Sequence, residues 1–452
     1  MKNYLLDKIR SSEIIQSVMT LSIGTILSQV IPIAVSFILA RLYTPDDYGD
    51  WGIFSSYTAI LAVIVCGKYE YAILRPKRLI DAFHLCALSL IIGCCVSLLL
   101  YLFLGIAFCV DFSYIVKIRG VLWLPTYVMF LGVLQILSNY ANREELYKKI
   151  AISSILRSCI QASSRIAMGT FNVRGGLIVG ATLGLVGGCS YLVKQLSFQK
   201  IFYNISLKRL RELIIEYRKF PIFEAPSGLL NVLSANIPLL LLAYFFPKEF
   251  VGYFSMAMTI LYVPMSFIGA ALGQVFYKKA CTWTDSNQVS VLALKIFQFT
   301  FYIGIIPVLF LILLGNTIFV FLLGVQWEMV GTFAMYMSTW IWLVLCFSPL
   351  STIFLVKDKQ QVGMFLNLIM LFSRIIVICI GGYLLKSISI TILLYGTVGV
   401  ILWFIEGMYI WRLTKINLSK KKALLMLCIF LGVFGIWCIK IISFFYIDCI
   451  KI

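Results

Sequence analysis

The strongest constraint on this chain is a series of apolar segments that run for about 20 residues or more with at most one charge. A helix of that length crosses the ~30 Å hydrocarbon core of a bilayer. Charged residues make up only 13% of the chain, whereas a soluble domain carries roughly 25%. These segments therefore predict an all-α integral membrane protein, because so apolar a chain needs lipid as its solvent.

We place thirteen membrane spans on the chain, of which the last is an addition to a core of twelve. The predicted fold class is thus all-α, with about 12–13 transmembrane helices in two six-helix lobes. The expected spans are residues 16–40, 52–73, 82–108, 120–140, 150–170, 175–193, 222–246, 250–276, 290–314, 329–355, 361–384, 389–411 and 423–446.

The basic residues support this order of spans. With the N-terminus in the cytoplasm, 25 of the 38 lysines and arginines fall on the cytoplasmic side and only 7 on the opposite side. Such an excess is what the positive-inside rule predicts, and a missing span would scramble it. The same rule accounts for the net charge of +19, so we expect no nucleic-acid partner.

The longest polar segment, roughly residues 194–221, has six spans before it and six or seven after it. An even number of spans per half gives both halves one orientation, which is a parallel repeat with a pseudo-twofold axis along the membrane normal. The predicted domains are an N-terminal six-helix lobe (1–198), a cytoplasmic linker (199–221), a C-terminal six-helix lobe (222–415) and a possible extra transmembrane helix (416–452).

The first external turns of the two halves have similar chemistry. Residues 42–51 and residues 244–253 each combine an aromatic residue, a proline, two charged positions and then a glycine close to another aromatic residue. This similarity favours an internal repeat, which is typical of transporters that rock one half against the other. Chance is the alternative explanation, because these residue types are common at membrane interfaces.

Arg157, Gln161 and Arg165 share one face of the fifth span, since they follow one another at intervals of four residues. A charged residue at mid-membrane costs about 2.5–3.5 kcal/mol on insertion scales and usually faces a cavity. Arginine stays charged and binds phosphate through a bidentate fork. We therefore predict a cationic cavity for a phosphate-bearing substrate. The alternative is that these side chains reach the interface or form internal ion pairs.

Further ionisable and polar residues lie in other spans. Arg374 is close to the middle of the eleventh span and is the strongest single candidate for substrate binding, whereas Lys295 lies near the inner edge of the ninth. Glu224 and Asn231 lie on one face of the seventh span, and Glu70 ends the second. We expect these last three to line a polar cavity or to carry a coupling ion, although Glu224 could equally pair with basic residues at the interface.

No grouping typical of an enzyme or a metal site is evident in the sequence. The thirteen cysteines include no CxxC pair, and the single histidine, His84, cannot form a metal site alone. The chain also contains no Walker A loop, no nucleophile elbow and no HExxH motif. We therefore expect no catalytic residues, no metal and no cofactor.

Two N-terminal stretches resemble a known family. The run from Ser28-Gln29 to Ile38-Leu39-Ala40-Arg41-Leu42-Tyr43-Thr44-Pro45-Asp46-Asp47-Tyr48-Gly49 is similar to the start of O-antigen (Wzx-type) polysaccharide flippases, and so is Lys68-Tyr69-Glu70-Tyr71-Ala72-Ile73-Leu74-Arg75. These flippases form the polysaccharide-transport branch of the multidrug/oligosaccharidyl-lipid/polysaccharide (MOP) superfamily. The resemblance implies a MATE-like fold, with two six-helix lobes around a cationic cavity.

The resemblance also implies a function in lipopolysaccharide biosynthesis. Such a protein flips an undecaprenyl-pyrophosphate-linked oligosaccharide, for example an O-antigen repeat unit, from the cytoplasmic to the periplasmic leaflet of the bacterial inner membrane, with ion coupling. Its expected partners are this anionic lipid-linked oligosaccharide, membrane lipid and other polysaccharide assembly proteins.

Two other functions stay open at this point. A cation-coupled multidrug exporter of the same superfamily would need essential carboxylates deep in its spans, and the sequence places its acidic residues near the span edges. A membrane polysaccharide polymerase would be expected to carry a large external loop, whereas the external loops predicted here are short.

Overall fold

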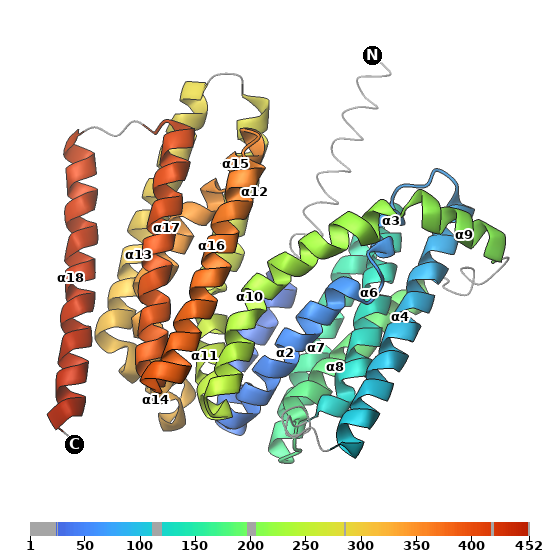
Figure 1. Cartoon of the computed structure of the whole chain (residues 1–452), viewed down its shortest axis with the longest axis horizontal. Coiled ribbons are helices and arrows are strands. Elements are labelled where there is room, and N and C mark those ends of the chain that lie inside the picture. The colour runs from blue at the N-terminus through green and yellow to red at the C-terminus, as the bar shows by residue number, and fades with distance from the viewer. Residues whose placement is uncertain are drawn as a thin grey trace. The chain divides into compact units, whose positions relative to one another are not determined.

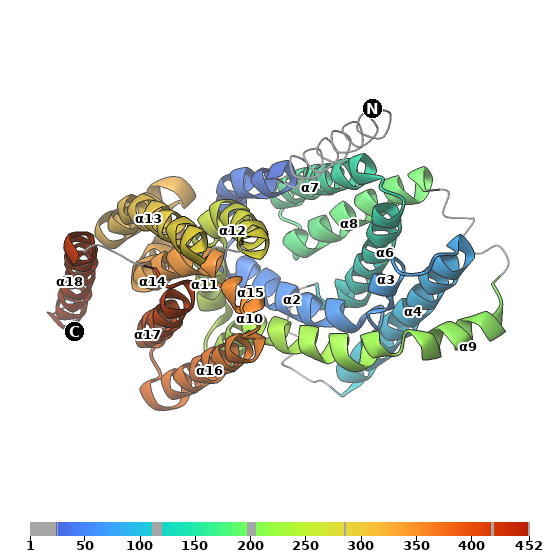
Figure 2. The same ribbon diagram turned by 90° about the horizontal axis from the view of Figure 1, so that it is seen from above.

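The computed structural model describes residues 24, 26–110, 120–196, 205–283, 286–416 and 420–450, and all regular structure in these residues is helical. The chain forms two compact units, Met1–Asn236 and Ile237–Ile452. Figure 1 shows their helices by colour along the chain, and Figure 2 shows them from above. Each unit is described by itself.

The first unit is built mainly from long helices, with one further helix, α9, that lies across the end of α4 (Figure 1). In chain order the helices are Ile26–Leu42, α2 (Pro45–Ile64), α3 (Tyr69–Ala72), α4 (Leu79–Cys109), η1 (Val121–Trp123), α6 (Leu124–Arg143), α7 (Tyr147–Thr170), α8 (Gly176–Gln195), α9 (Leu207–Glu216), η3 (Phe220–Glu224) and α10 (Ala225–Phe245), which continues into the second unit.

The second unit packs its helices around α14, in which every residue from Val330 to Phe347 is buried. Trp340 and Trp342 are among its largest fully buried side chains. Its helices are α11 (Lys248–Leu261), η4 (Met265–Gly269), α12 (Ala270–Thr282), α13 (Ser286–Leu323), η5 (Val325–Trp327), α14 (Glu328–Phe347), η6 (Ser348–Leu350), α15 (Ile353–Val356), α16 (Gln360–Cys379), η7 (Ile380–Leu385), α17 (Ile388–Thr414) and α18 (Lys420–Ile450).

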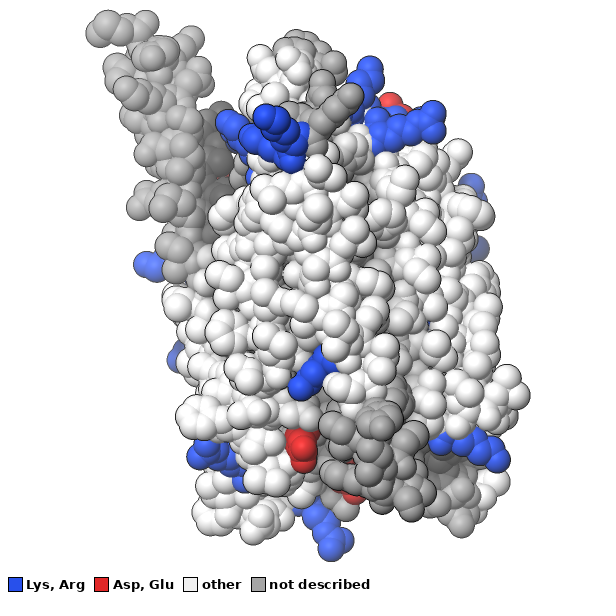
Figure 3. Space-filling model, turned by 90° about the vertical axis from the view of Figure 1, so that its left-hand side faces the viewer, with Lys and Arg blue, Asp and Glu red and all other residues white. Residues whose placement is uncertain are grey.

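Nine helices of the described part are long and apolar enough to cross a membrane. The face in Figure 3 has its lysines and arginines mainly toward the top and bottom, with a broad band between them that is almost free of charge. Each of the thirteen expected spans lies mainly on helix where its residues are described, with turns inside some of them. The predicted all-α membrane fold is confirmed.

Several boundaries differ from the prediction. The second helix begins seven residues earlier, at Pro45, because Thr44 and Asp47 form a capping box there. It ends before Gly67 and Lys68, whose φ angles of 60° and 62° are incompatible with a right-handed helix. The segment expected as one span at 250–276 is divided into α11 and α12 by a π-helical turn that follows Pro264, which has no backbone N–H to donate.

Helices α7 and α8 pack closely because α8 presents a column of glycines. Gly176, Gly180, Gly184 and Gly188 recur every four residues and so lie on one face. A Cβ atom added at Gly184 would lie 2.8 Å from the backbone oxygen of Arg157. Small residues at this spacing let two membrane helices approach to backbone contact.

Candidate functional site

Arg165 is the most deeply buried of the predicted basic site residues. Its side chain is only 8% exposed, and its Nε donates to the backbone oxygen of Leu177 at 2.9 Å. Its guanidinium lies 4.2 Å from the ring centroid of Trp51, which is a cation–π contact. Its Nη2 has no hydrogen-bond partner among the described residues. Arg165 therefore keeps one donor free inside the helix bundle.

The basic face of α7 packs against the glycine column of α8. Arg157 and Gln161 contact α8 next to Gly184, and the stem of Arg165 does so next to Gly180. Both Arg157 and Gln161 are half-buried. The structure thus brings the three predicted residues together on one face, and the missing side chains of the glycines leave room for their long stems.

Arg374 occupies a comparable place in the second unit. It lies on α16 and is half-buried. Its guanidinium carbon is 5.4 Å from the ring centroid of Trp340 on α14 and 5.6 Å from that of Tyr395 on α17. Two aromatic faces therefore hold this side chain between three helices of the unit.

Arg165 and Arg374 are alike in how their charge is accommodated. Within the described residues neither forms a salt bridge with a carboxylate, and both stack on aromatic rings. A desolvated cation–π contact contributes about 2 kcal/mol, which offsets only part of the cost of a charge in a membrane. Each unit therefore contains an arginine whose charge is not neutralised by a carboxylate of the described residues.

The remaining predicted residues lie in more open positions. Lys295 on α13 is exposed, and so are Glu224 at the end of η3 and Asn231 on α10. No ion pair joins Glu224 to a basic residue among the described parts of the chain. The proposed roles of these three residues in substrate binding or coupling stay predictions.

The buried carboxylates of the described residues are Asp50, Glu70, Asp81 and Glu406, of which the sequence analysis named only Glu70 as a candidate site residue. Glu70 on α3 is 1% exposed, and Glu406 on α17 is 7% exposed. The Oε2 atom of each has no hydrogen-bond partner in the described structure. The burial of Glu406 was not predicted from the sequence. Among the described residues, each unit therefore contains one buried glutamate with an oxygen that has no hydrogen-bond partner.

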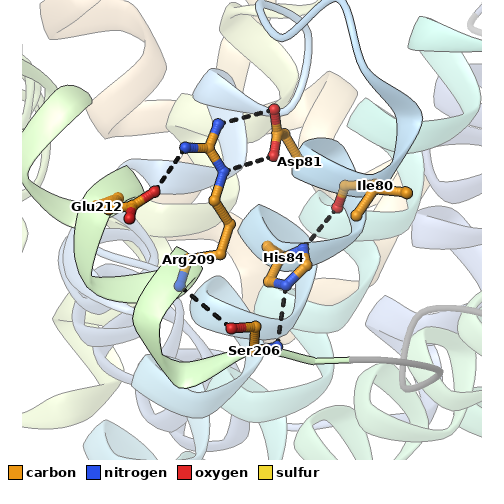
Figure 4. A network of polar contacts seen from close by, with 6 residues as sticks. All are labelled: Ile80, Asp81, His84, Ser206, Arg209 and Glu212. Carbon is orange, nitrogen blue, oxygen red and sulfur yellow. Dashed lines mark hydrogen bonds and ion pairs between the residues drawn. The ribbon is translucent and has the colours of Figure 1, made fainter.

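A polar network that the sequence analysis did not predict fastens α9 to the first turn of α4 (Figure 4). Arg209 binds Asp81 in a bidentate manner, with Nε at 2.8 Å from Oδ1 and Nη2 at 3.0 Å from Oδ2. Its Nη1 donates to Glu212 at 2.8 Å. These carboxylates raise the pKa of Arg209 above its ordinary value. Arg209, Asp81 and Glu212 therefore form a clamp that is charged at any physiological pH.

His84 completes this network and is fixed as a structural residue. Its Nε2 accepts a hydrogen bond from the backbone N–H of Ser206 at 3.1 Å. The proton is then on Nδ1, which donates to the backbone oxygen of Ile80 at 2.7 Å. The single histidine thus serves to hold the start of α9 against α4.

Breaking the clamp is expected to loosen α9 without unfolding the protein. Asp81→Asn and Arg209→Gln each remove the bidentate pair, which is partly exposed, so hydrogen exchange of the α9 amides should become up to about fivefold faster. Glu212→Gln removes only the outer partner and serves as the control. Unchanged exchange in both Asp81→Asn and Arg209→Gln would show that apolar contacts alone hold this helix.

Comparison with known proteins identifies the family. The profile of the family described as "Polysaccharide biosynthesis protein" matches residues 38–331, which is more than half of the chain. The chain belongs to this polysaccharide biosynthesis family. No curated protein matches the chain.

Solved structures establish the fold of this polysaccharide biosynthesis protein. The lipid II flippase MurJ in an inward closed conformation is 14% identical, with a TM-score of 0.65 over 96% of this chain and 100% of that one. An inward-facing MATE family multidrug resistance transporter of the MOP superfamily is 15% identical, with a TM-score of 0.62 over 89% and 100%. A MOP superfamily transporter from Pyrococcus furiosus is 16% identical, with a TM-score of 0.54 over 88% and 96%.

The family match confirms the predicted resemblance to a polysaccharide biosynthesis family. The MATE-like fold class is likewise confirmed. At 14–16% identity these structures show the fold and leave the cargo of this polysaccharide biosynthesis protein to be argued from its own residues.

Proposed function

We propose that this protein flips a lipid-linked oligosaccharide with an anionic pyrophosphate from the cytoplasmic to the periplasmic leaflet of a bacterial inner membrane. The observation that carries the proposal is the state of Arg165, which is buried, has no carboxylate partner among the described residues and keeps Nη2 free. A guanidinium with a free donor is suited to bind phosphate oxygens. The lipid II flippase among the structures of similar fold supports the same kind of cargo.

In the proposed mechanism each unit contributes one arginine to the transport of the pyrophosphate. Arg165 and Arg374 are held in place by aromatic rings, which do not neutralise their charge as a carboxylate would. Polar and aromatic residues bind the sugars while the lipid tail stays in the bilayer, and alternating access then exposes the headgroup on the other side. Ion coupling would use a buried carboxylate, for which Glu70 is the predicted candidate.

Reconstitution tests the proposal directly. Proteoliposomes that contain the protein and a fluorescent undecaprenyl-pyrophosphate oligosaccharide are treated from outside with a glycan-cleaving enzyme that cannot cross the membrane. We expect cleavage to proceed beyond the outer-leaflet fraction that is accessible in protein-free vesicles. If cleavage stops at that fraction while a cationic dye is transported, the alternative of a multidrug exporter with the same fold is correct and the proposal is wrong.

A further inference from the structure

Helix α9 has a broad apolar face of which only one half is covered. Leu210 and Leu213 are buried against the first unit. On the adjoining part of the helix surface, Leu207 is 81% exposed, Ile214 39% and Ile215 58%. These positions are contiguous on a helix of 3.6 residues per turn, so the uncovered apolar surface directly continues the buried one.

The position of α9 relative to the membrane follows from its contacts. The clamp between Arg209 and Asp81 ties it to the first turn of α4, which is a candidate membrane span. Near its other end, the backbone oxygen of Ile214 accepts a hydrogen bond from the hydroxyl of Tyr69 at 3.3 Å. The ring of Phe220 lies 5.0 Å from the guanidinium of Arg75, and the next candidate span begins at this phenylalanine. Helix α9 therefore lies at the level where the spans of this unit leave the membrane.

The charges of α9 are arranged asymmetrically around the helix. Arg211 falls within the uncovered apolar arc, and Lys208 falls at its rim; both are exposed. The two carboxylates of the helix, Glu212 and Glu216, fall on the opposite side. An apolar strip flanked by long basic side chains is the pattern of a helix that lies in the membrane interface.

We infer that α9 is an interfacial helix that binds the anionic headgroups of the cytoplasmic leaflet. Leu207, Ile214 and Ile215 insert at the boundary between headgroups and acyl chains, and Lys208 and Arg211 contact lipid phosphates. This assignment does not depend on the proposed cargo, because it uses only residues of the segment between the spans. Its partner is a lipid surface that carries net negative charge.

Hydrogen exchange of the full-length protein in lipid nanodiscs tests this inference. In discs that contain phosphatidylglycerol, we expect the amides of 207–216 to exchange about 30-fold more slowly than in discs of phosphatidylcholine alone, since Lys208 and Arg211 near an anionic surface contribute about 1 kcal/mol each. The combined variant Lys208→Gln and Arg211→Gln should lose this difference. The matched control Lys357→Gln with Lys359→Gln removes two exposed lysines of the second unit and should keep it.

The clamp provides an internal check on the fold of the variant. Exchange of the first turn of α4 should be the same in the variant and in the unmodified protein, because neither substituted residue contacts Asp81. Equal exchange of 207–216 in both kinds of disc would overturn the inference. So would an unchanged response in the Lys208 and Arg211 variant, or the same protection on adding inorganic phosphate to phosphatidylcholine discs.

Discussion

Replacement of Arg165 or Arg374 by glutamine is expected to reduce transport of the lipid-linked oligosaccharide by about 10- to 100-fold each. In the proposed mechanism each substitution removes a charge-assisted hydrogen bond to phosphate, and such a bond contributes about 1.5–3 kcal/mol. Arg374→Lys should restore part of the activity, since lysine keeps the charge but not the planar fork. The measurement is flipping in proteoliposomes, or surface polysaccharide in cells that depend on the variant.

The exposed arginine Arg174, in the turn between α7 and α8, is the matched control for these substitutions. Arg174→Gln removes the same charge nine residues from Arg165 and should leave transport unchanged. Membrane levels and melting temperatures must be compared as well, because Arg165 also donates to the backbone of Leu177. Normal transport in both Arg165→Gln and Arg374→Gln would exclude these residues from the mechanism.

Substitution of Gly184 by leucine is expected to prevent α7 and α8 from packing. Even a Cβ atom at this position would lie 2.7 Å from the Cβ atom of Gln161 and 2.8 Å from the backbone oxygen of Arg157. Backbone atoms cannot move aside as a side-chain tip can, so the two helices must separate. Gly184→Ala should already cost about 1–3 kcal/mol, and Gly184→Leu should leave little folded protein. The melting temperature in detergent measures both effects.

Two other glycines calibrate this prediction. At Gly187 the closest contact of an added Cβ atom would be the terminal methyl group of Ile160, which can rotate away, so Gly187→Ala should be milder than Gly184→Ala. At Gly105 an added Cβ atom meets nothing within 4 Å, and Gly105→Ala should be neutral or slightly stabilising. Equal melting temperatures for the alanine variants at positions 184 and 105 would refute close packing of α7 and α8.

The sequence was sufficient to predict the membrane helices because their signal is local. Long apolar segments and the uneven distribution of basic residues each depend on composition over about 20 residues. Individual ends were less predictable, since the second helix is set by the cap at Thr44 and by the left-handed conformation of Gly67 and Lys68. The ends of the helix depend on single residues, and an average of hydropathy over about 20 residues does not show their effect.

The site was predictable in part. The shared face of Arg157, Gln161 and Arg165 follows from helical spacing and is found in the structure. The aromatic partners of Arg165 and Arg374 are on other helices, and nothing in the spacing of the arginines indicates them. The glycines of α8 recur every four residues in the sequence. This pattern indicates the face of α8 on which a neighbouring helix such as α7 packs closely.

The clamp shows why the linker was harder to predict. A segment with many charges between two spans suggests a loose connection, and the partner of Arg209 lies 128 residues earlier in the chain, at Asp81. Only the folded arrangement brings the two together. The same holds for His84, whose hydrogen bond to Ser206 gives a structural role to a residue that no motif explains.

The fastening of α9 has a consequence for the covalent connection between the two units. Because the segment up to Phe220 is bound to the first unit, it cannot act as a slack tether. The chain passes from one unit to the other within α10, at Asn236 and Ile237, and Pro238 interrupts the hydrogen-bond ladder of that helix at the same place. The covalent connection between the two units is therefore a continuous helix, and Pro238 is the point in that helix where one backbone hydrogen bond cannot form.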